Sequence, residues 1–197
     1  MVANLQKGAD AAAKNSDNAM MQLIRPGKSF ITTNTTRAGS NLIVEVVETY
    51  NKESGLISDE VRVVSSGLDG GLWIGTNQGL SYLKDGILRN FGHEEGFMDS
   101  RVFSVFAEGP KDLWVGSDKG LLHFDSKKFV RISSRDGLFD DKVYTVLDDG
   151  LGYLWMSSNK GVFRVSKAEA KKFIAGEVRK IKSSSFGIVD GMRSVEC

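Results

Sequence analysis

Apolar residues recur along residues 55–190 in a pattern that returns every 41 residues. Each unit contains an apolar segment led by valine, a segment that begins with Leu-Trp, and a third apolar segment after a turn that ends in glycine. A period near 40 residues with several short strands per period is typical of a β-propeller, in which each unit forms one blade. A large aromatic side chain fills the wedge-shaped space between blades well, so the tryptophans are expected to pack there. They are Trp73, Trp114 and Trp155, at one position of the repeat.

Each unit predicts four antiparallel strands of an all-β fold. The first strand is apolar at most positions, because an inner strand contacts neighbouring blades on both faces. The valines that lead it are Val61, Val102 and Val143. The Leu-Trp segment forms the second strand, and its turn to the third ends in a glycine that tolerates positive φ, at Gly79, Gly120 and Gly161. The fourth strand is expected at Ile87–Phe91 and Phe129–Ile132.

The repeat also predicts how the chain is divided. Residues 29–197 are expected to form a partial propeller, and β-prone segments between Phe30 and Tyr50 would complete a partial blade. Residues 1–28 belong to no repeat and are interpreted as a polar tail or helical arm. The repeats lie at about 55–95, 96–136 and 137–190, and the next blade would start at 191–197. Within the last repeat, Ser166 is expected to N-cap a short helix that ends at Gly176.

Composition agrees with an all-β chain and argues against several classes of function. The 22 glycines suit a fold with many turns, and 41% hydrophobic residues suffice for a core. A net charge of +1 argues against a general nucleic-acid-binding protein. The single cysteine, Cys197, excludes an intramolecular disulfide framework, and two histidines leave little for a metal site. No segment has the apolar length of a transmembrane helix.

No residues form a recognisable catalytic or metal-binding pattern, so we expect neither enzymatic activity nor a cofactor. Cys197 would need a nearby base and a formed pocket to act as a nucleophile. His123 occupies a variable strand position of the repeat, and His93 lies in a loop that is expected to be solvated. The Asp-Gly turns lack the ligand count of a calcium site. A lysine-rich segment at residues 167–182 is interpreted as a solvated helix face in preference to a surface for anions.

Propeller geometry predicts where a ligand would bind. Inner strands begin beside the central channel, so the residue before each leading valine is expected near one mouth of that channel. These residues are Glu60, Arg101 and Lys142, and the candidates just after the valine are Arg62 and Tyr144. Their charge and size vary while their surroundings repeat, as in a scaffold that carries a changeable site. The alternative is that they are ordinary exposed strand ends.

The repeated units resemble the two-component regulator propeller repeat. The resemblance rests on the Gly-Leu junction at Gly55, the valine-led strand, the segment Leu72-Trp73-Ile74-Gly75-Thr76 and the turn before Leu80. The final segment, from Phe186 to Cys197, resembles late blades of such sensors, and the likeness extends from about residue 55 to the end. It implies an extracytoplasmic sensor region of a bacterial histidine kinase, hybrid regulator or diguanylate cyclase, with no catalytic role of its own.

The number of blades adds a further expectation. Three blades with parts of two others do not close a ring of four to eight, so apolar blade faces would be left open for the remaining blades of a longer chain or for a second copy. The sequence therefore predicts a sensor segment that binds a small molecule or oligosaccharide. It would bind no nucleic acid and reach a membrane only through other parts of a full-length receptor. The alternatives are a stand-alone scaffold that homodimerises and binds protein partners, and a remnant of a carbohydrate-active propeller enzyme.

Overall fold

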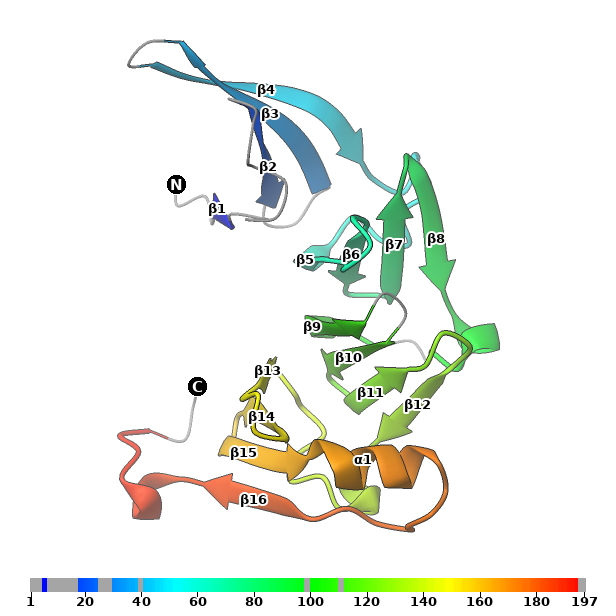
Figure 1. Cartoon of the computed structure of the whole chain (residues 1–197), viewed down its shortest axis with the longest axis vertical. Coiled ribbons are helices and arrows are strands. Elements are labelled where there is room, and N and C mark those ends of the chain that lie inside the picture. Colours follow the sequence, from blue (N-terminus) through cyan, green and yellow to red (C-terminus); the bar gives the residue numbers. More distant parts are fainter. Residues whose placement is uncertain are drawn as a thin grey trace.

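The computed structural model describes residues 5–6, 18–24, 30–38, 41–97, 100–109 and 112–194, with side chains from residue 48 onward. It contains four antiparallel sheets of four strands each and one short α-helix. The sheets follow one another along an arc, and among the described residues they do not close into a ring (Figure 1). The predicted all-β fold with an incomplete set of propeller-like blades is therefore confirmed.

Each sheet is built from strands that are consecutive in the sequence. The N-terminal sheet contains β1 (Leu5–Gln6), β2 (Asn18–Ile24), β3 (Phe30–Ala38) and β4 (Asn41–Tyr50). Blade 1 contains β5 (Val61–Ser66), β6 (Leu72–Thr76), β7 (Leu80–Lys84) and β8 (Ile87–Phe91). Blade 2 contains β9 (Val102–Gly109), β10 (Asp112–Ser117), β11 (Gly120–Phe124) and β12 (Phe129–Ile132). Blade 3 contains β13 (Thr145–Asp148), β14 (Tyr153–Ser158), β15 (Gly161–Ser166) and β16 (Ser183–Phe186).

The turns between the second and third strands repeat as the sequence predicts. Gly79, Gly120 and Gly161 have φ angles of 150°, 121° and 122°. A hydroxyl three residues earlier donates to the carbonyl of each glycine, for example Thr76 Oγ1 to Gly79 at 2.9 Å. Short 3-10 helices join one blade to the next at η1 (His93–Glu95) and η2 (Ser134–Asp136), and η3 (Ile188–Asp190) follows blade 3.

The first 28 residues differ from the expected polar tail or helical arm. Their described parts are β1 and β2, and β2 pairs antiparallel with β3 along its whole length. Leu23 and Ile24 lie opposite Ile31 and Phe30 in this pairing, so the segment gains ladder hydrogen bonds that its composition does not reveal. The result is a complete fourth sheet in place of the expected partial blade. Cys197 lies outside the described residues.

Blades 1 and 2 are each covered by the following blade through a close contact at a glycine. Inner strand β9 lies beside β5, and β13 lies beside β9. A Cβ atom added at Gly75 would lie 2.4 Å from Cγ1 of Val102, and one at Gly116 would lie 2.7 Å from the carbonyl oxygen of Val143. Trp73 and Trp114 are buried in the apolar clusters that form at these two interfaces. The leading valine thus fits a space that only glycine leaves open.

Blade 3 has an uncovered face among the described residues. Ser157 stands where the other blades have Gly75 and Gly116. Leu147 is 61% exposed, whereas its repeat equivalent Phe106 packs against the core between blades 2 and 3. Trp155 differs from the expected position between blades, since it is partly exposed and stacks on Phe186 within its own sheet. A small apolar cavity of about 150 Å³ lies on this face.

The helix predicted in the last repeat is present as α1 (Lys167–Ile174). The hydroxyl of Ser166 accepts a hydrogen bond from the backbone N–H of Glu169 at 3.4 Å, as in an N-cap, and Gly176 has a positive φ of 78°. Ala170 is buried in the core between blades 2 and 3. The helix connects β15 with β16 and accounts for the greater length of this repeat.

Candidate ligand-binding site at the start of the inner strands

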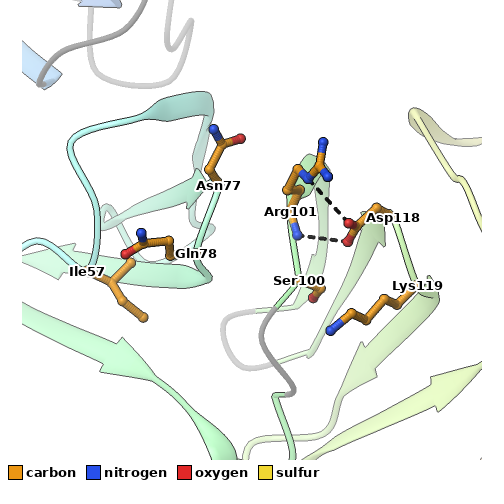
Figure 2. A pocket seen from close by; sticks show the side chains of 7 residues that line it. All are labelled: Ile57, Asn77, Gln78, Ser100, Arg101, Asp118 and Lys119. Atoms are coloured by element: carbon orange, nitrogen blue, oxygen red, sulfur yellow. Dashed lines mark hydrogen bonds and ion pairs between the residues drawn. The ribbon is translucent and has the colours of Figure 1, made fainter.

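A cavity of about 600 Å³ lies between blades 1 and 2, where the inner strand of blade 2 begins. Its lining comes from the turns after β6 and β10, from the residues just before β9, and from the loop between β4 and β5 (Figure 2). The residues are Ile57, Asn77, Gln78, Ser100, Arg101, Asp118 and Lys119. The lining is mostly polar and both blades contribute to it, so a ligand here would contact two blades at once.

Arg101 and Asp118 form the ordered wall of this cavity. The backbone N–H of Arg101 donates to Asp118 Oδ1 at 2.8 Å, and the Arg101 Nε atom lies 3.4 Å from Asp118 Oδ2. The backbone N–H of Asp118 donates to the carbonyl of Arg101 at 3.2 Å. These contacts join the turn after β10 to the lead into β9, and Figure 2 shows the remaining guanidinium nitrogens beyond this pair. Arg101 therefore keeps donors for a ligand while its position is fixed.

Ser100 is a buried polar residue at the floor of the cavity. It is 4% exposed, and its Oγ has no hydrogen-bond partner among the residues that the structure describes. A buried hydroxyl without a partner costs about 1–3 kcal/mol, so an unpaired one calls for an explanation. Lys119 lines the same cavity, and Figure 2 shows its side chain reaching toward the segment that carries Ser100.

A smaller cavity of about 250 Å³ lies at the same place of the next repeat, between blades 2 and 3. It shares Asp118 and Lys119 with the first cavity, so the two are adjacent. Its other lining residues are Arg131, Ser133, Arg135 and Asp141. The two cavities together carry four cationic and two anionic side chains. The lining of the two cavities therefore carries a net positive charge.

The side chains of Arg62, Phe103 and Tyr144 form a row of contacts at the start of the inner strands, and Arg62 donates a hydrogen bond to Asn77 of the larger cavity. Arg62, Phe103 and Tyr144 occupy one position of the repeat, and the strand pairing skips Arg62 and Phe103 as β-bulges. The Arg62 guanidinium lies 5.4 Å from the centre of the Phe103 ring, and the rings of Phe103 and Tyr144 are 5.0 Å apart. Bulges often re-aim side chains near functional sites. The row offers an aromatic surface close to the polar cavities.

The five residues singled out from the sequence are only partly brought together. Arg101 lines the larger cavity, and Arg62 and Tyr144 both contact the Phe103 ring. Glu60 and Lys142 are exposed and line neither cavity. Sequence reasoning missed Ser100, Lys119 and Phe103. Phe103 could have been found from its repeat position, because it is the equivalent of Arg62 and Tyr144.

A separate charged cluster lies between blade 2 and α1. Glu108, Asp112 and His123 each place one potential metal-ligand atom within 4.8 Å of the others. The ammonium group of Lys171 lies 2.9 Å from Glu108 Oε2, and that of Lys167 lies 3.2 Å from Glu108 Oε1. Two cations thus already neutralise the carboxylates where a metal would have to sit. We interpret the cluster as an ion-pair network that holds α1 against blade 2.

The groups around Glu108 stabilise its negative charge. Burial disfavours the charged form of Glu108, but hydrogen bonds from Lys171, Trp114 and Lys167 outweigh it and lower the pKa of Glu108 to about 2. His123 lies in β11, at the strand position that the repeat predicts, and it is buried there: its ring centre is 4.3 Å from that of Trp114, and its Nε2 lies 2.7 Å from Asp112 Oδ1. The ion pairs with α1 and the hydrogen bond from Trp114 therefore give the cluster a structural role.

Comparisons with known proteins bear on the fold. No family model matches the chain, and no curated protein matches it. Among solved structures, the chain is similar to the extracellular domain of a protein assigned to a hybrid two component system of B. thetaiotaomicron, with a TM-score of 0.60 and 20% sequence identity. The match covers 89% of this chain and 24% of that chain, so this chain spans about a quarter of its length. At this identity the likeness supports a common fold.

No helix in the described part of the chain combines the length and the apolar character that a membrane crossing requires.

Proposed function

We propose that this chain is a non-catalytic, ligand-sensing segment of a bacterial two-component-type receptor, and that its ligand binds between blades 1 and 2. The observation that carries the proposal is the polar cavity of about 600 Å³ at the start of the inner strands, with Arg101 held in place on one wall. Small-molecule sites are usually concave, and the polar groups that line them fix the orientation of the ligand. A small molecule or an oligosaccharide fits this volume. The aromatic rings of Phe103 and Tyr144 offer a surface against which a sugar ring can pack.

The proposal extends to the protein as a whole. The likeness to an extracellular domain of a two-component protein supports a sensor role in outline. An extracytoplasmic location and a signalling output elsewhere in a longer protein are part of the proposal. Because the cavity is lined by two blades, a bound ligand would favour one relative position of them and so shift the population of receptor states.

The test is a binding experiment on the full 197-residue chain. A panel of defined neutral and acidic oligosaccharides, two to six sugars long, is screened by thermal shift, and positive compounds are measured by calorimetry. Arg101→Ala removes a charged hydrogen-bond donor from the cavity, which typically costs about 1.5–3 kcal/mol. We expect the dissociation constant to rise by roughly 10- to 100-fold.

Matched controls exist at the same repeat position. Glu60→Ala and Lys142→Ala change exposed residues that line neither cavity, so both variants should bind as the wild type does. If Arg101→Ala binds as tightly as the wild type, or if Glu60→Ala weakens binding equally, the ligand does not use this cavity and the proposal fails.

A second candidate role, assembly through blade 3, is favoured by its uncovered face. Leu147 is 61% exposed there beside the small apolar cavity and the partly exposed Trp155. We propose that this face pairs with a second copy or with remaining blades of a longer chain. Sedimentation velocity of the isolated chain should show concentration-dependent dimers that Leu147→Glu abolishes. Leu68→Glu, which changes an equally exposed leucine in the turn after β5, should leave them intact.

A further inference from the structure

The repeat offers an internal comparison at the position of Ser100. Its equivalents, 41 residues away on either side, are Asp59 and Asp141. The carboxylate of Asp59 accepts the backbone N–H of Lys52 at 2.7 Å. The carboxylate of Asp141 accepts the backbone N–H and the hydroxyl of Ser134, at 2.6 Å and 2.9 Å. Two of the three repeats therefore place a carboxylate at this position, and the middle repeat lacks it.

The missing carboxylate coincides with the larger cavity. The cavity beside Ser100 has a volume of about 600 Å³, and the adjacent one, which contains the Asp141 side chain, has about 250 Å³. Each cavity is lined by the turn after the second strand of the preceding blade, which is Asn77-Gln78 beside Ser100 and Asp118-Lys119 beside Asp141. The repeat therefore places Ser100 and Asp141 in the same part of each cavity. Serine lacks the carboxylate that lies at this position in the neighbouring repeat, so the Ser100 side of the larger cavity has no anionic group at this place.

The groups around this space suit an anion. The Ser100 hydroxyl is buried and has no partner in the described part of the chain, so a ligand group that moves in far enough to reach it gains a hydrogen-bond donor. Arg101 and Lys119 line the cavity with it, and the single anionic group, Asp118, already accepts from Arg101. In the adjacent cavity, the carboxylate of Asp141 shares its lining with Arg131 and Arg135. Asp141 accepts its hydrogen bonds from Ser134, and the two arginines add positive charge to the same lining.

We propose that the cavity between blades 1 and 2 binds a carboxylate group of the ligand, in the place that Asp59 and Asp141 fill in the other repeats. Ser100 donates its hydroxyl to this group, and Lys119 and Arg101 supply the opposing charge. The inference rests on the proposed function, because it names the chemistry recognised by the same cavity.

The experiment compares a carboxylate with a neutral molecule of the same shape. Acetate and acetamide are titrated into the ¹⁵N-labelled full chain at constant ionic strength, and the amide signals of Ser100, Arg101, Asp118 and Lys119 are followed. We expect saturable shifts with acetate, and a dissociation constant for acetamide at least tenfold larger. Ser100→Asp places the protein's own carboxylate in the cavity and should weaken acetate binding at least tenfold. Ser100→Ala keeps the space and should weaken it less.

Each outcome decides between defined alternatives. Should Ser100→Asp not fold, Lys119→Ala replaces it, and this variant should lose affinity for acetate while its weak binding of acetamide stays unchanged. If acetate and acetamide bind equally well and Arg101→Ala abolishes both, the cavity is a ligand site but the carboxylate inference is wrong. If neither causes a saturable shift, the inference is also wrong, whereas the proposed function is still decided by the oligosaccharide panel. If Ser100→Asp binds acetate as the wild type does, the anion binds elsewhere.

Discussion

Trp114 and Trp155 occupy the same position of the repeat but different surroundings, so replacing each by alanine tests the assignment of covered and open blade faces. Trp114 is fully buried between blades 2 and 3, and its Nε1 atom donates to Glu108 Oε2 at 3.1 Å. Trp155 is partly exposed, and its Nε1 donates to Asp149 Oδ2 at 3.0 Å. The indole hydrogen bonds are therefore alike, although Trp155 also stacks on Phe186 of its own sheet, and the covering blade is the main difference.

The expected cost follows from this difference. Truncation of a fully buried aromatic side chain costs about 3–5 kcal/mol, because the lost burial is joined by the cost of the cavity left behind. At the open face no closed cavity forms and neighbouring side chains can move inward, so Trp155→Ala should cost about 1–2 kcal/mol. With a urea m-value of about 2 kcal/mol per M, the unfolding midpoint should fall by about 2 M for Trp114→Ala and by less than 1 M for Trp155→Ala.

The assay is urea unfolding followed by far-ultraviolet circular dichroism, which does not depend on the deleted indole. The milder pair Trp114→Phe and Trp155→Phe gives the same comparison if Trp114→Ala is unfolded in water. Equal costs for the two positions at low protein concentration would refute the assignment, since they would mean that the face of blade 3 is covered within a single chain. A cost at Trp155 that appears only at high concentration would instead locate a second copy on this face.

Two further predictions concern packing and charge. Gly116→Ala should destabilise the chain by about 1–3 kcal/mol, because its Cβ would lie 2.6 Å from Ser104 Oγ and 2.7 Å from the Val143 carbonyl; Ser157→Ala at the same repeat position should be nearly neutral in the same urea assay. The pKa of Glu108 is about 2 in the folded chain against an ordinary 4.5, so its contribution to stability is complete above about pH 4.5 and is lost as the pH falls toward 2. Melting temperatures measured between pH 6 and pH 2.5 should therefore fall less steeply for Glu108→Gln than for the wild type, and parallel curves would contradict the assigned network.

Much of the fold is local and could be predicted from the sequence. The fourth strands at Ile87–Phe91 and Phe129–Ile132 have the predicted bounds, and the turn glycines have the expected positive φ. Ser166 and Gly176 mark the ends of the segment that holds α1. These features depend on short-range hydrogen bonds and backbone conformation, which a residue and its near neighbours dictate. The N-terminal strands were not predicted from the sequence. The strand β2 depends on its pairing with β3, and its own residues show only a weak preference for the β conformation.

The 41-residue unit and its four strands follow from the sequence alone, and the sequence also predicts the end of the blades at which we propose that a ligand binds. Which of the repeated positions are buried, covered or unpaired depends on the tertiary structure. Trp155 and Trp114 are the same residue at the same phase, and the presence of a following blade alone makes one covered and the other open. In the sequence, Ser100 is one of many substitutions within the repeat. The structure distinguishes it, because its hydroxyl is buried and has no partner among the described residues. Burial and pairing depend on side chains that arrive from another blade, and a periodic pattern along one chain does not contain that information.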